Sequence, residues 1–137
     1  MLEQDYLMRM ILQFIQGIRM SIQGPDKDPL DSAEALEHAI ADAVHIDRST
    51  LFSLDAQSFV LLMRVSAIDE ALVPYLVHTM MLEAVYLTDA HKEYLAALRT
   101  SQAQALADAY DVALLDEKSL RALEFLDLDD LDNRIEV

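Results

Sequence analysis

Apolar residues recur at three- and four-residue steps along most of this 137-residue chain, and strand-type alternation is nowhere sustained. Because an α-helix turns once every 3.6 residues, this spacing places the apolar side chains on one face of a helix. Glycine and proline, which usually form turns, number only two and three, so we expect long helices with few tight loops. The pattern predicts an all-α fold, a compact bundle of five to six helices.

Helix caps and breakers place the boundaries of these helices. Gly24 and Pro25 end a first helix, Asp31 and Glu34 form the capping box of a second, and Pro74 kinks a fourth or marks its effective start. The helices are expected over residues 3–23, from 31 to a turn at 47–54, and over 55–66, 69–88 and 90–110, with a sixth from about 117. The chain is expected to be a single helical domain: an N-terminal helix at 1–23, a linker at 24–30, a helical core at 31–125 and an acidic tail at 126–137.

Two of these helices have patterns that predict how they pack. The helix at 55–66 is apolar nearly all round, so we expect it at the centre of the bundle. The helix at 90–110 carries two faces. One is expected to be buried and comprises Leu95, Leu98, Ala105, Leu106 and Ala109. The other consists of small residues that let a neighbouring helix come close, namely Ala96, Ala103 and Ala107.

The fourth and fifth helices together indicate an antiparallel hairpin with an approximate tetratricopeptide-repeat (TPR) spacing. The matching positions are Leu82, Tyr86, Ala96 and Ala103, whereas the turn is one residue too long and Glu83 replaces the usual small residue. Residues 1–11 (MLEQDYLMRMI) and 102–109 (QAQALADA) resemble a family of short bacterial proteins, a domain of unknown function. The resemblance covers the whole chain and implies a TPR-like helical fold; it implies no catalytic residue.

Charge and composition exclude several classes of function. The 25 acidic and 10 basic residues give a formal net charge of −15, which would repel nucleic-acid phosphates and anionic membranes. There is no cysteine, so disulfides and thiolate metal sites are excluded. The N-terminus is acidic where a signal peptide is basic, and no apolar run approaches the ~20 residues of a membrane span. We therefore expect a soluble, cytoplasmic protein that binds neither nucleic acid nor membrane.

No standard catalytic or cofactor motif is present. The two glycines lie too far apart for a phosphate-binding or dinucleotide loop, and no His-Glu-x-x-His sequence or serine nucleophile elbow occurs. We expect no cofactor.

One stripe of polar residues on the second helix has the composition of a metal site. Glu34, His38, Asp42 and His45 follow each other at steps of four, four and three, so they share one helix face. Imidazole and carboxylate are suitable ligands for zinc, iron or nickel, but a second helix would have to complete the coordination sphere. The stripe also lies opposite the apolar face, where solvated side chains are usual, and this second interpretation is favoured.

Two further polar residues lie on or beside apolar faces and are candidates for a pocket. His78 and Gln102 would line it, together with Tyr75, Glu83 or Arg64. The favoured alternative is a hydrogen-bonded pair or a capped polar edge that fixes helix register, because buried polar groups usually have partners.

The first helix suggests a surface for self-association. Tyr6, Met10 and Met20 lie off its main apolar stripe, and 53% of all residues are hydrophobic, which is high for a chain of this length. We expect a homodimer through this helix; burial of its two sides within its own domain is the alternative. The function most consistent with the sequence is a non-enzymatic helical protein-interaction module, a scaffold or adaptor with a protein partner. The alternative is a metal- or small-molecule-binding protein that uses the polar stripe or the pocket.

Overall fold

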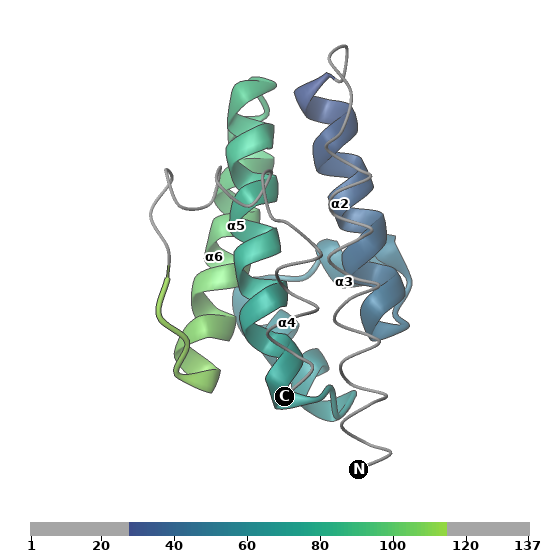
Figure 1. Cartoon of the computed structure of the whole chain (residues 1–137), viewed down its shortest axis with the longest axis vertical. Helices are drawn as coiled ribbons and strands as arrows, with labels where there is room; N and C mark the ends of the chain where they lie inside the picture. Colours follow the sequence, from purple (N-terminus) through teal and green to yellow (C-terminus); the bar gives the residue numbers. More distant parts are fainter. Residues whose placement is uncertain (1–27, 115–137) are drawn as a thin grey trace, which may run out of the picture.

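The computed structural model describes residues 28–114, and this part of the chain is all-α, as predicted (Figure 1). It contains no strand within these residues. Its elements are α2 (Pro29–Val44), α3 (Arg48–Phe52), α4 (Ala56–Val65), the 3-10 turn η1 (Glu70–Leu72), α5 (Val73–Asp89) and α6 (Glu93–Tyr110).

Helix α5 occupies the middle of the described bundle. Helix α2 packs along one side of it and α6 along the other, while α4 packs against α6 (Figure 1). Only residues 90–92 connect α5 to α6, so the two helices run antiparallel as a hairpin. The predicted hairpin is therefore present.

Aspartate side chains start four of these elements. Asp28, Asp47, Asp55 and Asp69 each accept a hydrogen bond from a backbone N–H of the following turn, which satisfies a donor that the helix itself leaves free. Asp28, rather than Asp31, caps α2, so the last two residues of the predicted linker are helical. Asp47 starts the short helix α3 inside the predicted turn at 47–54.

Pro74 has the position that the sequence predicts. Asp69 caps the single turn η1, and α5 then begins at Val73 with Pro74 in its first turn, where a missing N–H costs nothing. The proline therefore marks the effective start of the long helix.

The prediction that residues 55–66 form the central helix is wrong. In α4 only Phe59 and Met63 are buried, whereas Leu61 is 63% exposed and Val65 is 75% exposed. Helix α4 lies at the edge of the bundle and offers one face to it. The central position belongs to α5, which two long helices flank and which is buried on most of its circumference. The expectation that no apolar run approaches a membrane span is wrong by length and composition, because the segment Glu70–Asp89, with a mean hydropathy of 1.3, is long and apolar enough for one. In the structure, 61% of its 18-residue apolar stretch is buried inside the bundle.

The predicted buried face of α6 is largely wrong, and its small-residue face is confirmed. Leu95 is 40% exposed, and of its predicted face only Leu106 is buried. The buried residues are Ala96, Arg99, Gln102, Ala103, Leu106 and Ala107. Alanines at three of these positions let α5 come close, and that approach determines which side of α6 faces inward.

The turns between helices are tight although they contain no glycine. His45, Ala67, His91 and Asp111 have positive φ angles of 53–61° and each follows the end of a helix. A residue in this left-handed conformation at the end of a helix is usually a glycine. The scarcity of glycine thus does not prevent tight turns, contrary to the sequence-based expectation.

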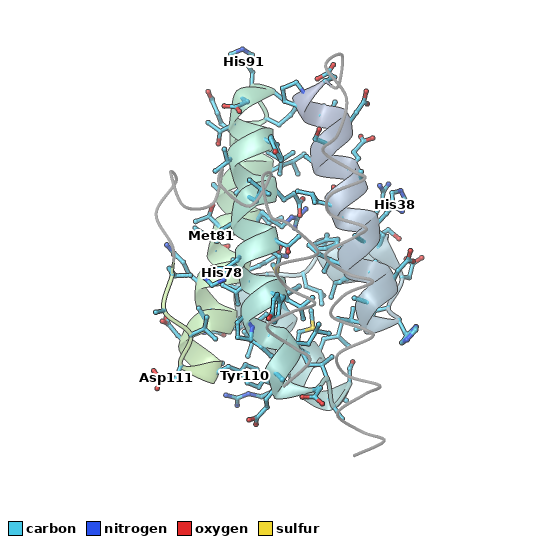
Figure 2. The ribbon with its side chains drawn as sticks, in the orientation of Figure 1. His38, His78, Met81, His91, Tyr110 and Asp111 are labelled. Atoms are coloured by element: carbon cyan, nitrogen blue, oxygen red, sulfur yellow. The ribbon has the colours of Figure 1, made fainter. Side chains whose placement is uncertain are left out.

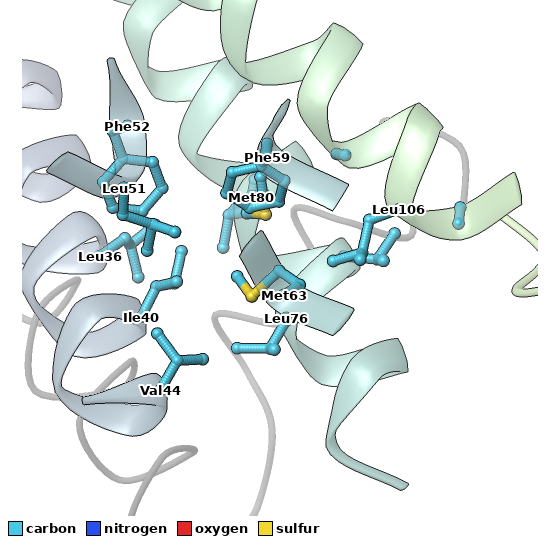
Figure 3. Close-up of a cluster of buried hydrophobic side chains, with 14 of the residues drawn as sticks. Leu36, Ile40, Val44, Leu51, Phe52, Phe59, Met63, Leu76, Met80 and Leu106 are labelled. Atoms are coloured by element: carbon cyan, nitrogen blue, oxygen red, sulfur yellow. The ribbon is translucent and has the colours of Figure 1, made fainter. Parts of the chain in front are cut away.

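Side chains from all five helices meet in one apolar core (Figure 3). Leu36 and Ile40 of α2 lie across from Met80 of α5, while Phe59 stacks near Phe52 with ring centroids 6.5 Å apart. The core includes completely buried side chains from α2, α3, α4, α5 and α6, among them Leu36, Ile40, Leu51, Phe59, Met63, Leu76, Met80 and Leu106.

Candidate functional site

The most unusual feature of the interior is a cluster of charged and amide side chains centred on Arg99 of α6. The Arg99 side chain is 3% exposed, and its guanidinium donates hydrogen bonds to three partners. Nε donates to Oε2 of Glu83 on α5 (2.7 Å), and Nη2 donates to Oε1 of Glu37 on α2 (3.0 Å). Nη1 donates to Oε1 of Gln102, one turn further along α6 (2.5 Å). We call these four residues the Arg99 cluster.

The Arg99 cluster also holds the chain between α3 and α4. The amide nitrogen of Gln102 donates to the carbonyl oxygen of Leu54 (2.6 Å) and lies 3.5 Å from that of Phe52. The guanidinium carbon of Arg99 lies 4.1 Å from the centroid of the Phe52 ring, which is within the range of a cation–π contact. The cluster therefore connects α2, α5 and α6 to the segment that follows α3.

The charges of the Arg99 cluster do not balance. Two carboxylates, Glu37 and Glu83, face one guanidinium, so the fully ionised cluster carries one surplus negative charge. Glu83 is completely buried, and its Oε1 has no hydrogen-bond partner in the described structure. Burial raises the pKa of Glu83 to about 8, although the positive charge of Arg99 opposes the change. Burial also raises the pKa of the half-buried Glu37, again against Arg99.

The geometry of the Arg99 cluster is better suited to holding the helices together than to catalysis. The hydrogen-bonding groups of Arg99 and Gln102 that the structure describes are directed at each other, at Glu37 and Glu83, or at backbone carbonyls. Within residues 28–114, neither a hydroxyl nor an imidazole is hydrogen-bonded to Arg99 or Gln102 as a nucleophile or base. One carboxylate oxygen, Oε1 of Glu83, is left without a partner.

The metal-site candidates of the second helix lie on its outer surface. Glu34, His38, Asp42 and His45 are all exposed, and His45 stands beyond the end of α2 in a left-handed conformation. Figure 2 shows His38 pointing away from the bundle, where Nη1 of Arg48 donates to its Nε2 (3.0 Å). Across residues 28–114, no three His, Asp or Glu side chains gather in a way that could hold a metal ion.

The two pocket candidates do not meet. Gln102 is completely buried in the Arg99 cluster, as described above. His78 lies half-buried on α5, and its Nε2 is 3.1 Å from the carbonyl oxygen of Ala113, beyond the end of α6 (Figure 2). Of the suggested companions, Glu83 joins Gln102 through Arg99, whereas Arg64 is exposed on α4.

Sequence reasoning missed Arg99, although two signals pointed to it. Glu83 is the single acid in the apolar stretch from Val73 to Thr88, and a buried carboxylate is costly unless a basic group pairs with it. Arg99 lies three residues after Ala96 and four before Ala103, on the face that small residues predict to be close-packed. The interface candidates Tyr6, Met10 and Met20 lie outside the described residues.

A second unusual feature is the outer face of α4, which we define by Leu61 and Val65. Both are large apolar side chains, one helical turn apart, and are the most exposed apolar residues of this helix. Tyr94, at the start of α6, is more exposed still, at 82%, but its neighbour Leu95 is only 40% exposed.

Comparison with known proteins adds no relative to this picture. The chain matches no protein-family model, no curated protein and no solved structure. The function must therefore be argued from the fold, the Arg99 cluster and the outer face of α4.

Proposed function

We propose that this chain is a non-enzymatic helical protein-interaction module, a scaffold or adaptor that binds a basic amphipathic helix of a partner protein on the outer face of α4. The observation that carries the proposal is the exposure of Leu61 (63%) and Val65 (75%) on a helix whose opposite face is packed in the core. Apolar side chains gain free energy when a partner removes them from water.

The spacing of the two residues suits a helical partner. Leu61 and Val65 are four positions apart, so they project from neighbouring turns of the same side of α4. Apolar anchors at this spacing are typical of helix–helix recognition, in which the partner supplies a matching apolar stripe. Helix α4 is ten residues long and its outer face offers one such pair, so we expect a single docked helix.

Charge favours a basic partner over a second copy of this chain. The protein has a net charge of −15, and exposed acids cap or follow α4, namely Asp55, Asp69 and Glu70, against one exposed base on that helix, Arg64. Lysine and arginine beside the apolar stripe of a partner would be attracted to this surface. Another copy, with the same surplus of acids, would be repelled.

The interior supports a non-enzymatic role. Of the two main pocket candidates, Gln102 is hydrogen-bonded within the Arg99 cluster and His78 is directed at a backbone carbonyl. The TPR-like character of the hairpin belongs to the same proposal: Leu82, Tyr86, Ala96 and Ala103, the four positions of the TPR-like spacing, are all buried. TPR hairpins serve as interaction scaffolds.

Two synthetic peptides test the proposal. A helical peptide with leucine on one face and lysine on the other should bind, and a peptide with the same leucines and glutamate in place of lysine should not. Calorimetric titration should show that Leu61→Asp or Val65→Asp weakens binding of the lysine peptide by about tenfold or more, since burial of one such side chain contributes about 1.5–3 kcal/mol.

Tyr94→Asp is the matched control, because it introduces the same charge at an exposed ring on another helix. It should leave binding of the lysine peptide within about twofold, an effect well under 1 kcal/mol. Equal loss in Tyr94→Asp and Leu61→Asp would mean that binding is not specific to the outer face of α4, and the proposal would be wrong. Light scattering that shows a dimer disrupted by Leu61→Asp would assign the face to a second copy instead.

A further inference from the structure

The contacts of Arg99 place two carboxylates against one guanidinium. Glu37 and Glu83 each contact the same guanidinium, through Nη2 at 3.0 Å and Nε at 2.7 Å. The third donor, Nη1, is directed at Gln102. Arg48 acts on both carboxylates, and Glu34 and His38 act on Glu37, but among the described residues neither carboxylate forms an ion pair with a base other than Arg99. An uncompensated charge is costly in an apolar interior, and a proton removes it at the lowest cost.

We propose that Glu37 and Glu83 share one proton in the folded bundle, and that this proton is a pH-sensitive lock between α2 and the α5–α6 hairpin. With the proton bound, one carboxylate and one guanidinium balance, and the cluster holds the three helices together. When the proton leaves at alkaline pH, two carboxylates surround one guanidinium, and α2 loosens from the hairpin. This inference does not rest on the binding function of α4.

The surroundings of Glu83 agree with such a lock. Among the described residues its buried Oε1 has no partner, so an ionised carboxylate there keeps the hydrogen bond that Oε2 accepts from Arg99 and lacks one at Oε1. The charged groups that act on it are Arg99 from α6, Glu37 from α2 and, more weakly, Arg48 from α3. Helix α4 contributes none, since its one charged residue, Arg64, is exposed. Burial outweighs the two bases and raises the pKa of Glu83 from 4.5 to about 8.

The direction of the pH effect follows from this difference. Between pH 4.5 and about 8, the folded protein keeps a proton that the unfolded chain has released. Raising the pH through this window therefore favours the unfolded state, by up to about tenfold in the unfolding equilibrium constant per pH unit. Below pH 4.5 both states hold the proton, and above about 8 the loss is complete. An ordinary ion-paired glutamate has a lowered pKa, so it stabilises the folded state more as the pH rises.

Urea unfolding of the full chain at several values between pH 5 and 9 tests the lock. In Glu83→Gln the amide imitates the protonated carboxyl, so the unfolding constant should lose the steep rise of the wild type. Glu37→Gln should lose it as well, because Glu83 can then remain ionised opposite Arg99. Glu93→Gln, at an exposed position on α6 whose charge does not act on Glu37 or Glu83, should retain the wild-type slope.

The double variant Glu37→Gln/Glu83→Gln separates a shared proton from two independent ion pairs. It leaves Arg99 without a counter-charge, so its unfolding constant at pH 7 should exceed the product of the two single effects by about a hundredfold or more. Two independent ion pairs would give a simple product. That product, or a wild-type slope in Glu83→Gln, would overturn the proposal, and a slope that persists only in Glu37→Gln would overturn the sharing. If Glu83→Gln does not fold, the slope of Glu37→Gln decides.

Discussion

The Arg99 cluster and the outer face of α4 reverse the usual distribution of polar and apolar groups. Arg99 and Glu83 are charged residues at 3% and 0% side-chain exposure, whereas Leu61 and Val65 are apolar residues at 63% and 75%. Both regions lie in the same bundle, since α4 packs against α6. Burying charged groups and exposing large apolar side chains both cost free energy, so each region needs a compensating interaction.

The two regions differ in where that compensation is found. For the Arg99 cluster the compensating interactions lie within the chain. Glu37, Glu83 and Gln102 accept hydrogen bonds from the guanidinium, and the proposed shared proton neutralises the second carboxylate. The described residues contain no such compensation for Leu61 and Val65. The comparison therefore separates a region that organises the fold from a region that we expect to bind a partner. Three sets of substitutions and one titration test this distinction.

The largest effect is expected for Arg99→Met. Methionine keeps much of the side-chain volume but leaves the buried Glu83 and the half-buried Glu37 without the guanidinium that both contact. Breaking a buried ion pair at one partner typically costs about 3–5 kcal/mol of the free energy of unfolding. Urea unfolding at pH 7 measures it, with Arg64→Met as the control, since the exposed Arg64 should contribute less than about 0.5 kcal/mol. Equal effects at the two arginines would contradict the structural role of the cluster.

A smaller loss is expected for Gln102→Met. This change removes the acceptor of Arg99 Nη1 and the donor to the carbonyl of Leu54, while the side-chain size stays similar. Buried groups left without partners cost about 1–3 kcal/mol. Gln104→Met, at an exposed position on the same helix, should stay within about 0.5 kcal/mol of the wild type in the same unfolding experiment. A wild-type stability of Gln102→Met would show that the link to the segment after α3 is dispensable.

The smallest effect on stability is expected for Leu61→Ala and Val65→Ala. Both side chains are mainly in water, so their truncation should change the free energy of unfolding by about 0.5 kcal/mol or less. Phe59→Ala on the inner side of α4 should cost about 3–5 kcal/mol, because Phe59 is completely buried. Thermal unfolding of the three variants compares them. A large loss at Leu61 would mean that its outer face already packs within the chain, and the partner site would lie elsewhere.

Much of the fold followed from local patterns, because local chemistry determines where helices start and stop. Asp55, Asp69 and Pro74 marked their boundaries correctly, since side-chain caps and the proline ring act within a single turn. Which face of each helix is buried was harder to predict. The apolar content of α4 suggested a central position, but whether an apolar face is covered depends on its neighbours, and the spacing of α4 alone does not reveal them.

The candidate site shows the same division. The sequence placed Gln102 on or beside an apolar face; it is completely buried and hydrogen-bonded to the carbonyl of Leu54, but it does not pair with His78. Its central partner, Arg99, was not predicted, because an arginine on an exposed-looking helix usually lies in solvent. The cluster depends on contacts 16 and 62 residues apart in sequence, between Arg99 and Glu83 or Glu37. Contacts at such separations come from the packing of three helices, which local periodicity does not specify.

The titration of the glutamate side chains by NMR tests the central claim most directly. In the full chain with ¹³C-labelled glutamate, the carboxyl signal of Glu83 should titrate with a midpoint of about 8, and the signal of Glu37 should respond over the same pH range because both share the proton. Glu83→Gln provides the assignment. A Glu83 midpoint at or below its ordinary value of 4.5 would show a fully ionised cluster and contradict the account.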